Sequence, residues 1–228
     1  MKKHYFLYEL SLNLLIFFLW IAPSFIFHGN SETVFSKWNF PAQNIVLTLA
    51  AVLVCIIELK LNDEKNFHFQ NKTELSLPKK ILISLICLIF LYALSVAFQL
   101  AGNFIGIKAD AKEIAVPKDF AATVFCALTF LFSASFEELI FRFYEPYSLN
   151  KLLAKVQNQH KYIFAEFLTA VLFSVCHIYL GLLAVLNAFF AHFIFRFCLK
   201  RTGKLLYPIA IHFLYNFTSL YLLSHAIQ

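Results

Sequence analysis

Residues 119–143, DFAATVFCALTFLFSASFEELIFRF, decide the class of fold. The stretch is apolar except for a few hydroxyl groups, an aspartate at its start and a charged cluster near its end. It is long enough to cross a bilayer, because a helix needs about 20 apolar residues to span roughly 30 Å of hydrocarbon. We predict further spans at about 7–27, 40–59, 81–101, 162–180, 182–199 and 205–224. Nothing alternates with the period of two that a membrane barrel requires, so the sequence predicts an all-α, polytopic transmembrane helical bundle of about seven spans.

The composition agrees with a membrane protein. Of the 228 residues, 61% are hydrophobic and 14% are charged, whereas soluble domains average about 25% charged residues. The net charge of +6 does not indicate a nucleic-acid partner, because the Lys and Arg residues lie in short loops between the apolar blocks. The five cysteines lie within apolar blocks and form no CxxC pair, so we interpret them as packing residues. Membrane lipid is the expected surrounding, and the richness in Phe, Ile, Lys and Asn indicates a bacterial source.

The distribution of lysine and arginine predicts the orientation in the cell membrane. Basic residues precede the first span, and the loops 60–80, 144–161 and 200–204 together carry more of them than the alternate loops together. Cytoplasmic loops carry this excess. The sequence therefore predicts a multi-pass protein with a cytoplasmic N-terminus and, after seven spans, a C-terminus on the other side.

Three ionisable residues, Glu137, Glu138 and Arg142, cluster near the end of the fourth span. Each costs about 2.5–3.5 kcal/mol at mid-membrane on insertion scales and therefore calls for a function or a partner. Glu138 and Arg142 are four residues apart, share a helix face and can pair. Glu137 points elsewhere and is left as a candidate general base.

Two later spans add polar residues with the same spacing of four. FSVCH (173–177) places Phe173 and His177 on one face, and HFLYN (212–216) does so for His212 and Asn216. We predict that Glu137, His177, His212 and Asn216 converge, with functional atoms within roughly 4–8 Å. From a rise of 1.5 Å per residue, their depths agree only if the fourth helix continues past residue 143 toward residue 150.

Other polar residues have simpler explanations. A lone histidine within a membrane is more often a hydrogen-bonding group between helices than a ligand. Glu9, Glu58 and Glu166 lie near span ends, where we expect them to reach water. His192 and Arg196 share a face of the sixth span. They contribute to the site, line its entrance or snorkel toward the membrane surface.

The three motifs together resemble the CAAX-protease and bacteriocin-processing (CPBP, Abi-type) intramembrane proteases. That family has EExxxR, FxxxH and HxxxN or HxxxD on successive membrane helices, and this chain has EELIFR (137–142), FSVCH and HFLYN. The resemblance covers about residues 119–220 and implies two parts: three N-terminal spans (1–118) and a four-span catalytic core (119–228). The chain departs from the family in Phe143, where glycine is frequent, and in the bulky sixth-span sequence NAFFAHFIFRF (187–197).

The resemblance implies an intramembrane endopeptidase. Glu137 would activate water with His177 assisting, His212 and Asn216 would stabilise the oxyanion, and the Glu138–Arg142 pair would support the site. We favour a glutamate-type mechanism without a metal cofactor, because the amide of Asn216 suits an oxyanion better than zinc. A zinc ion bound by Glu137, His177 and His212 is the alternative, since this ligand set leaves one coordination position open.

The expected partner is a peptide or membrane-protein substrate. Candidates are a prenylated CAAX-type tail, the leader of a bacteriocin or quorum peptide, and a membrane-anchored regulator. The main alternative function is a non-catalytic membrane regulator or bacteriocin self-immunity protein with the same fold. A small transporter is less favoured, because the polar residues concentrate in the last four spans. The sequence makes no prediction of the oligomeric state.

Overall fold

The computed structural model describes residues 3–26, 40–61, 75–106, 116–153 and 160–226, and these residues form helices and turns without strands. The helices group into seven long segments in the described part of the chain. They are α1 (Lys3–Ile16) with the π-helical turn η1 (Phe17–Ile21) and α2 (Ala22–Ile26), α3 (Ala42–Leu61), α4 (Leu77–Ile105), α5 (Phe120–Glu138) with the π-helical turn η4 (Leu139–Tyr144) and α6 (Glu145–Leu152), α7 (Lys161–Val175), α8 (Leu182–Thr202) and α9 (Leu206–Ala226). The predicted all-α class is confirmed.

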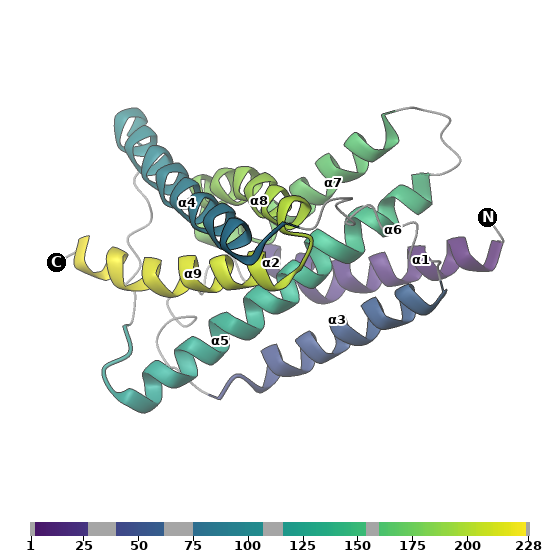
Figure 1. Cartoon of the computed structure of the whole chain (residues 1–228), viewed down its shortest axis with the longest axis horizontal. Coiled ribbons are helices and arrows are strands. Elements are labelled where there is room, and N and C mark those ends of the chain that lie inside the picture. Colours follow the sequence, from purple (N-terminus) through teal and green to yellow (C-terminus); the bar gives the residue numbers. More distant parts are fainter. Residues whose placement is uncertain (1–2, 27–39, 62–74, 107–115, 154–159, 227–228) are drawn as a thin grey trace.

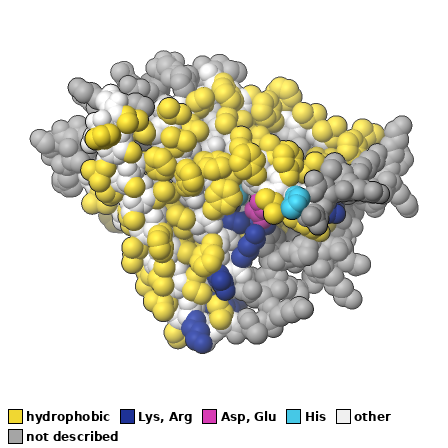
Figure 2. Space-filling view, turned by 90° about the horizontal axis from the view of Figure 1, so that it is seen from above, with side chains coloured by type: hydrophobic (Ala, Val, Ile, Leu, Met, Phe, Trp, Pro, Cys, Tyr) yellow, Lys and Arg dark blue, Asp and Glu magenta, His cyan; other side chains and the backbone are white. Residues whose placement is uncertain are grey.

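The surface agrees with a membrane protein. Five of the described segments are long and apolar enough to cross a bilayer: Phe6–Phe25, Ala42–Lys60, Leu77–Ile105, Phe120–Leu152 and Leu182–Thr202. Many large apolar side chains are exposed, among them Phe104 at 92% and Phe120 at 85%. Hydrophobic side chains cover most of the described surface in Figure 2. A soluble monomer rarely exposes so large a continuous apolar surface, so the molecule is a membrane protein.

Local sequence explains several helix ends. Asp119 caps α5, because its Oδ1 accepts a hydrogen bond of 2.8 Å from the backbone N–H of Ala122. Gly203 ends α8 with φ of 73°, the left-handed conformation that glycine adopts without a steric penalty. Pro208, in the first turn of α9, occupies a position where its missing N–H has no partner in the helix.

The fourth span is longer than the span predicted over 119–143. It runs from Phe120 to Leu152 as α5, η4 and α6, so the continuation toward residue 150 that the site requires is confirmed. Pro146 lies within this helix and has no N–H to bond the carbonyl of Arg142 four residues earlier. The helix widens into the π-helical turn η4 just before this proline, which keeps the segment continuous.

The fifth span is shorter than the span predicted over 162–180. Helix α7 ends at Val175. His177 lies in the turn that follows, and its backbone N–H donates a hydrogen bond of 3.0 Å to the carbonyl oxygen of Ser174. A short 3₁₀ turn (Ile178–Leu180) follows. Gly181 then has φ of 94° and ψ of 171°, a conformation essentially restricted to glycine. This glycine permits the sharp return from α7 to α8.

Figure 1 shows the α5–α6 segment as one long helix that crosses the molecule, with the chain termini at opposite ends. One hydrophobic core joins η1, α3, η4 and α7 and includes Ile21, Ala51, Phe141 and Phe173. The other core includes Leu91, Phe195 and Ile211 from α4, α8 and α9. Arg142 packs on Phe173 of the first core and on Phe195 of the second, so the candidate site lies where the two cores meet.

Candidate functional site

Glu137 is a buried carboxylate with one oxygen held and one left over. The residue is 8% exposed. Its Oε1 accepts a hydrogen bond of 2.9 Å from the hydroxyl of Ser133, one turn earlier on α5. Its Oε2 accepts no hydrogen bond from any described residue and lies 3.7 Å from Nε2 of His212. The carboxylate is thus oriented by Ser133, while Oε2 is buried without a hydrogen-bond donor from the described residues.

His212 on α9 connects both glutamates of α5. Its Nδ1 lies 2.8 Å from Oε1 of Glu138, and its Nε2 faces Glu137. The ring stacks on Phe195 of α8 with ring centroids 4.5 Å apart and an interplanar angle of 28°. The imidazole is therefore fixed by a carboxylate on one edge and by an aromatic ring on one face.

Arg142 supports this arrangement from the π-helical turn. Its Nε lies 3.3 Å from Oε2 of Glu138, and both side chains are fully buried. Its guanidinium carbon lies 3.9 Å from the ring centroid of Phe173 and 4.9 Å from that of Phe195. The predicted Glu138–Arg142 pair is present, and the structure adds that Glu138 also contacts His212.

His177 also lies beside Phe173. Its ring centroid is 4.9 Å from that of Phe173, and the Phe173 ring is 6.5 Å from the His212 ring. The Nδ1 of His177 contacts the carbonyl oxygen of Phe173 at 3.0 Å, and the imidazole is near enough to Glu137 and His212 for electrostatic interaction. Both histidines therefore lie near the ring of the motif phenylalanine, and His212 also lies 3.7 Å from Glu137.

Asn216 lies one turn beyond His212 on α9 and is partly buried. Its side chain makes no hydrogen bond or ion pair with another residue that the structure describes. The hydroxyl of the neighbouring Tyr215 accepts a hydrogen bond of 3.0 Å from the side-chain amide of Asn187. The direct participation of Asn216 in the site stays a prediction.

Glu137, His177 and His212, the alternative zinc ligands, are not arranged as a metal-binding group in this structure. Within the described ranges, no three His, Cys, Asp or Glu side chains lie close enough together to hold a metal ion. His212 Nδ1 is engaged by Glu138 and His177 Nδ1 by a backbone carbonyl. The choice between the two chemistries stays a prediction.

The carboxylates expected near water are differently placed. Glu9 and Glu58 are 0% and 1% exposed, and both pair with Lys151 of α6, so their assignment as water-exposed interfacial groups was wrong. Lys151 can reach them because α6 continues the fourth span beyond its predicted end. Glu166 has a partly exposed side chain and pairs with Arg196 and Lys200 of α8.

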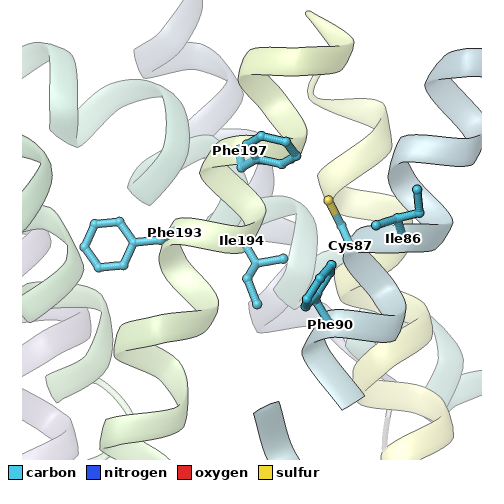
Figure 3. Close-up of a pocket in the computed structure, with 6 residues that line it drawn as sticks. All are labelled: Ile86, Cys87, Phe90, Phe193, Ile194 and Phe197. Carbon is cyan, nitrogen blue, oxygen red and sulfur yellow. The ribbon is translucent and has the colours of Figure 1, made fainter. Parts of the chain in front are cut away.

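The five cysteines agree with the prediction. Cys55, Cys87, Cys126, Cys176 and Cys198 are all buried and unpaired. A groove of about 340 Å³ lies between α4 and α8, where Cys87 and Phe90 face Ile194 and Phe197 (Figure 3). It is lined by apolar residues, and none of the predicted site residues lines it. The groove is therefore separate from the candidate site.

Two site residues were missed from the sequence. Ser133 lies four residues before Glu137, and this i, i+4 spacing is a signal that could have identified it. Phe195 belongs to the bulky sixth-span sequence that departs from the family. Its ring packs on both His212 and Arg142, a contact between helices far apart in sequence, so no local pattern could have predicted it.

Fold and site together define an all-helical membrane protein in which two glutamates, an arginine and two histidines gather between two hydrophobic cores. Residues 119–218 match the family described as type II CAAX prenyl endopeptidase Rce1-like. This confirms the resemblance to CAAX-type intramembrane proteases over that region, which is somewhat less than half of the chain and contains all three motifs. The match supports an endopeptidase. Neither a curated protein nor a solved structure matches the chain significantly.

Proposed function

We propose that the chain is an intramembrane endopeptidase that hydrolyses a peptide bond of a membrane-associated peptide or protein, with Glu137 as the general base. One observation carries this proposal. Oε2 of Glu137 is buried without a hydrogen-bond donor from the described residues, while Ser133 holds the other oxygen. A buried carboxylate oxygen without a donor is costly, and a bound water would satisfy it. This is also the arrangement that a general base needs.

The reaction would proceed by attack of water on the scissile carbonyl. Glu137 takes a proton from the water molecule while the water oxygen forms a bond to the carbonyl carbon. The carbonyl oxygen then carries a negative charge. When the C–N bond breaks, the proton held by Glu137 passes to the leaving amine, with His177 assisting. Each proton is accounted for without a further reactant.

His212 and Asn216 would stabilise the negative oxygen. Donors placed in advance around such an oxygen are a major source of rate enhancement, especially where water is excluded. Nε2 of His212 is the nitrogen on the Glu137 side, because Nδ1 lies on Glu138; it must carry a proton to act as a donor. The amide of Asn216, one turn further along α9, would supply the second donor.

The sequence match supports a peptide or protein as the substrate. Since Glu137 lies within a helix long enough to span the bilayer, the scissile bond must enter the membrane region, which favours a substrate that is itself membrane-associated. We retain the orientation predicted from the loops, with the N-terminus in the cytoplasm.

The test compares the membrane proteomes of cells that express the wild type or Glu137→Ala at equal levels. New protein N-termini are expected only with the wild type, and their positions identify the substrate. If the two proteomes are identical although both proteins are membrane-inserted and folded, the endopeptidase proposal fails and a non-catalytic regulator is favoured. Glu137→Gln, which keeps the shape of the side chain, serves as a second inactive variant.

A further inference from the structure

An ion pair outside the three motifs, between Arg196 and Glu166, contacts the backbone of the motif residue Arg142. Arg196 of α8 is 8% exposed, and its Nε donates to both carboxylate oxygens of Glu166 at 2.7 and 2.9 Å. A terminal nitrogen of the same guanidinium lies 2.6 Å from Oε1 of Glu166. The other terminal nitrogen donates a hydrogen bond of 2.6 Å to the backbone carbonyl oxygen of Arg142. Arg196 therefore connects α7 and α8 to the backbone of η4.

The carbonyl of Arg142 needs such a donor. In an α-helix it would accept from the N–H of residue 146, but residue 146 is proline and has no N–H. A carbonyl buried in this way without a donor costs about 1–3 kcal/mol. Arg196 supplies a charged donor from another helix at that position. The π-helical turn and the contact with Arg196 thus have a common local origin in Pro146.

Three side-chain contacts connect Arg142 to Glu137, the proposed base. Arg142 pairs with Glu138 through its side chain. Glu138 in turn binds Nδ1 of His212, whose Nε2 faces Glu137. A displacement of the Arg142 backbone is therefore transmitted to the carboxylate and the imidazole of the site, since all of these groups are buried and closely packed.

We propose that Arg196, oriented by Glu166, is a positioning residue for the reaction, because it binds the Arg142 carbonyl that Pro146 leaves without its helical donor. The inference rests on the proposed function. Arg196 contacts neither the substrate nor Glu137, and its effect passes through Arg142, Glu138 and His212. A purely structural ion pair between α7 and α8 is the competing explanation.

Lys200 provides a matched control. Its Nζ lies 3.2 Å from the same oxygen of Glu166, yet its side chain is 52% exposed. Lys200→Ala therefore removes a cation from Glu166 without removing the donor to Arg142. Pro146→Ala is the complementary change, because it gives residue 146 an N–H that can bond the Arg142 carbonyl. If Arg196 acts through that carbonyl, Pro146→Ala restores function to Arg196→Ala. If Arg196 serves only its ion pair with Glu166, it does not.

The first measurement needs no substrate. Hydrogen exchange is followed by mass spectrometry in purified full-length protein, in peptides that cover residues 139–150. Faster exchange is expected there in Arg196→Ala than in the wild type or Lys200→Ala, with partial recovery in Arg196→Ala/Pro146→Ala. Unchanged exchange in Arg196→Ala, or equal effects of Arg196→Ala and Lys200→Ala, would overturn the inference.

The second measurement is kcat and KM on the cleaved protein that the proteome comparison identifies. Arg196→Ala is expected to lower kcat by roughly 10²-fold, the order of loss caused by misplacing reacting groups by about 1 Å, with little change in KM. Lys200→Ala should keep kcat, and Pro146→Ala should restore a large part of the loss. No recovery in the double variant contradicts positioning through the carbonyl.

Two further variants keep the outcomes separable. If Arg196→Ala does not fold, Arg196→Lys replaces it, since an ammonium group can pair with Glu166 but cannot bridge carboxylate and carbonyl with a planar fork. It should show the same exchange and kcat defects. If Glu137→Gln keeps full activity, the proposed function fails, and the exchange data still decide whether Arg196 holds the backbone of Arg142.

Discussion

At the scale of single residues, the distinctive feature is an imidazole placed between two adjacent glutamates. Glu137 and Glu138 are consecutive on α5, so their side chains leave the helix about 100° apart. His212 contacts both because its two ring nitrogens lie on opposite edges, with Nδ1 on Glu138 and Nε2 facing Glu137. The two carboxylates are therefore engaged differently: Glu138 contacts the imidazole at 2.8 Å, and Glu137, the proposed base, keeps Oε2 without a hydrogen bond from the described residues.

Asn216 offers a direct test of the proposed oxyanion site. Asn216→Ala is expected to lower kcat by about 10²–10³-fold, the usual loss for one oxyanion donor. KM should change little, because the lost contact forms in the transition state. Asn216→Ser, which retains a shorter donor, should lose less. A variant with normal kcat and raised KM would show instead that Asn216 binds the substrate in its ground state.

The two proposed chemistries differ in their response to chelation. We expect purified protein to keep its activity after treatment with a chelator. Metal content and cleavage are measured on the same sample before and after treatment. One equivalent of zinc that is lost together with activity, and restores activity when added back, would establish the metal mechanism and leave Glu137, His177 and His212 as its ligands.

The buried Arg142 predicts a large stability effect. Arg142→Ala removes the partner of a fully buried Glu138, which typically costs about 3–5 kcal/mol. The cavity between Phe173 and Phe195 adds to the loss. Both folded yield and activity should fall, as measured by monodispersity in detergent and by thermal unfolding. A well-folded, fully active Arg142→Ala protein would contradict the support role assigned to this residue.

At the scale of helices, local sequence patterns predicted what depends on local contacts. The Glu138–Arg142 pair, for example, follows from a spacing of four residues. The end of α7 before His177 was not predicted. FSVCH continues an apolar helical pattern, and the sharp return at Gly181 depends on how α7 and α8 pack.

Gly181 is therefore expected to be sensitive although space surrounds it. A Cβ at Gly181 would meet no atom within 4 Å, so the cost of Gly181→Ala comes from its backbone conformation alone, about 1–3 kcal/mol. The turn it distorts carries His177, and activity should fall together with the unfolding temperature.

Gly106→Asn is the control for this prediction. Gly106 also has a positive φ and open surroundings, but it adopts the left-handed helical conformation that asparagine tolerates. Gly181→Asn should therefore be destabilised more than Gly106→Asn. Equal thermal stabilities of the two asparagine variants would contradict a special backbone requirement at Gly181.

At the scale of the whole molecule, the class of fold and the approximate spans could be predicted because lipid restricts the choice of structure. The polar contacts between distant helices could not. Glu9 and Glu58 were expected to reach water because each lies near a span end, yet they meet Lys151 within the bundle. Such a contact depends on three helices packing together, and no single helix carries a signal for it.

Lys151 therefore joins the N-terminal helices to the segment that carries the site. It lies on α6, and it pairs with Glu9 of α1 and with Glu58 of α3 at 3.0 Å. Glu9 also accepts a hydrogen bond of 2.6 Å from the hydroxyl of Ser148. Both carboxylates are almost completely buried, and Lys151 supplies one ammonium group to both.

Lys151→Ala is expected to destabilise the folded protein by about 3–5 kcal/mol, because it leaves two buried carboxylates without their cation. Lys200→Ala, which breaks an exposed pair with Glu166, should cost at most about 1 kcal/mol. The measurement is thermal unfolding in detergent, combined with limited proteolysis. Since Lys151 connects α1 and α3 to α6, cleavage within residues 1–61 should accelerate first.

Neutralising the whole cluster separates charge from packing in this prediction. In Lys151→Met/Glu9→Gln/Glu58→Gln the three charged groups of these ion pairs are neutral, and replacing buried ion pairs by neutral groups is often without cost. The triple variant should therefore recover much of the stability that Lys151→Ala loses. If Lys151→Ala is as stable as Lys200→Ala, or the triple variant is the least stable of the three, the cluster does not hold the N-terminal helices through charge pairing.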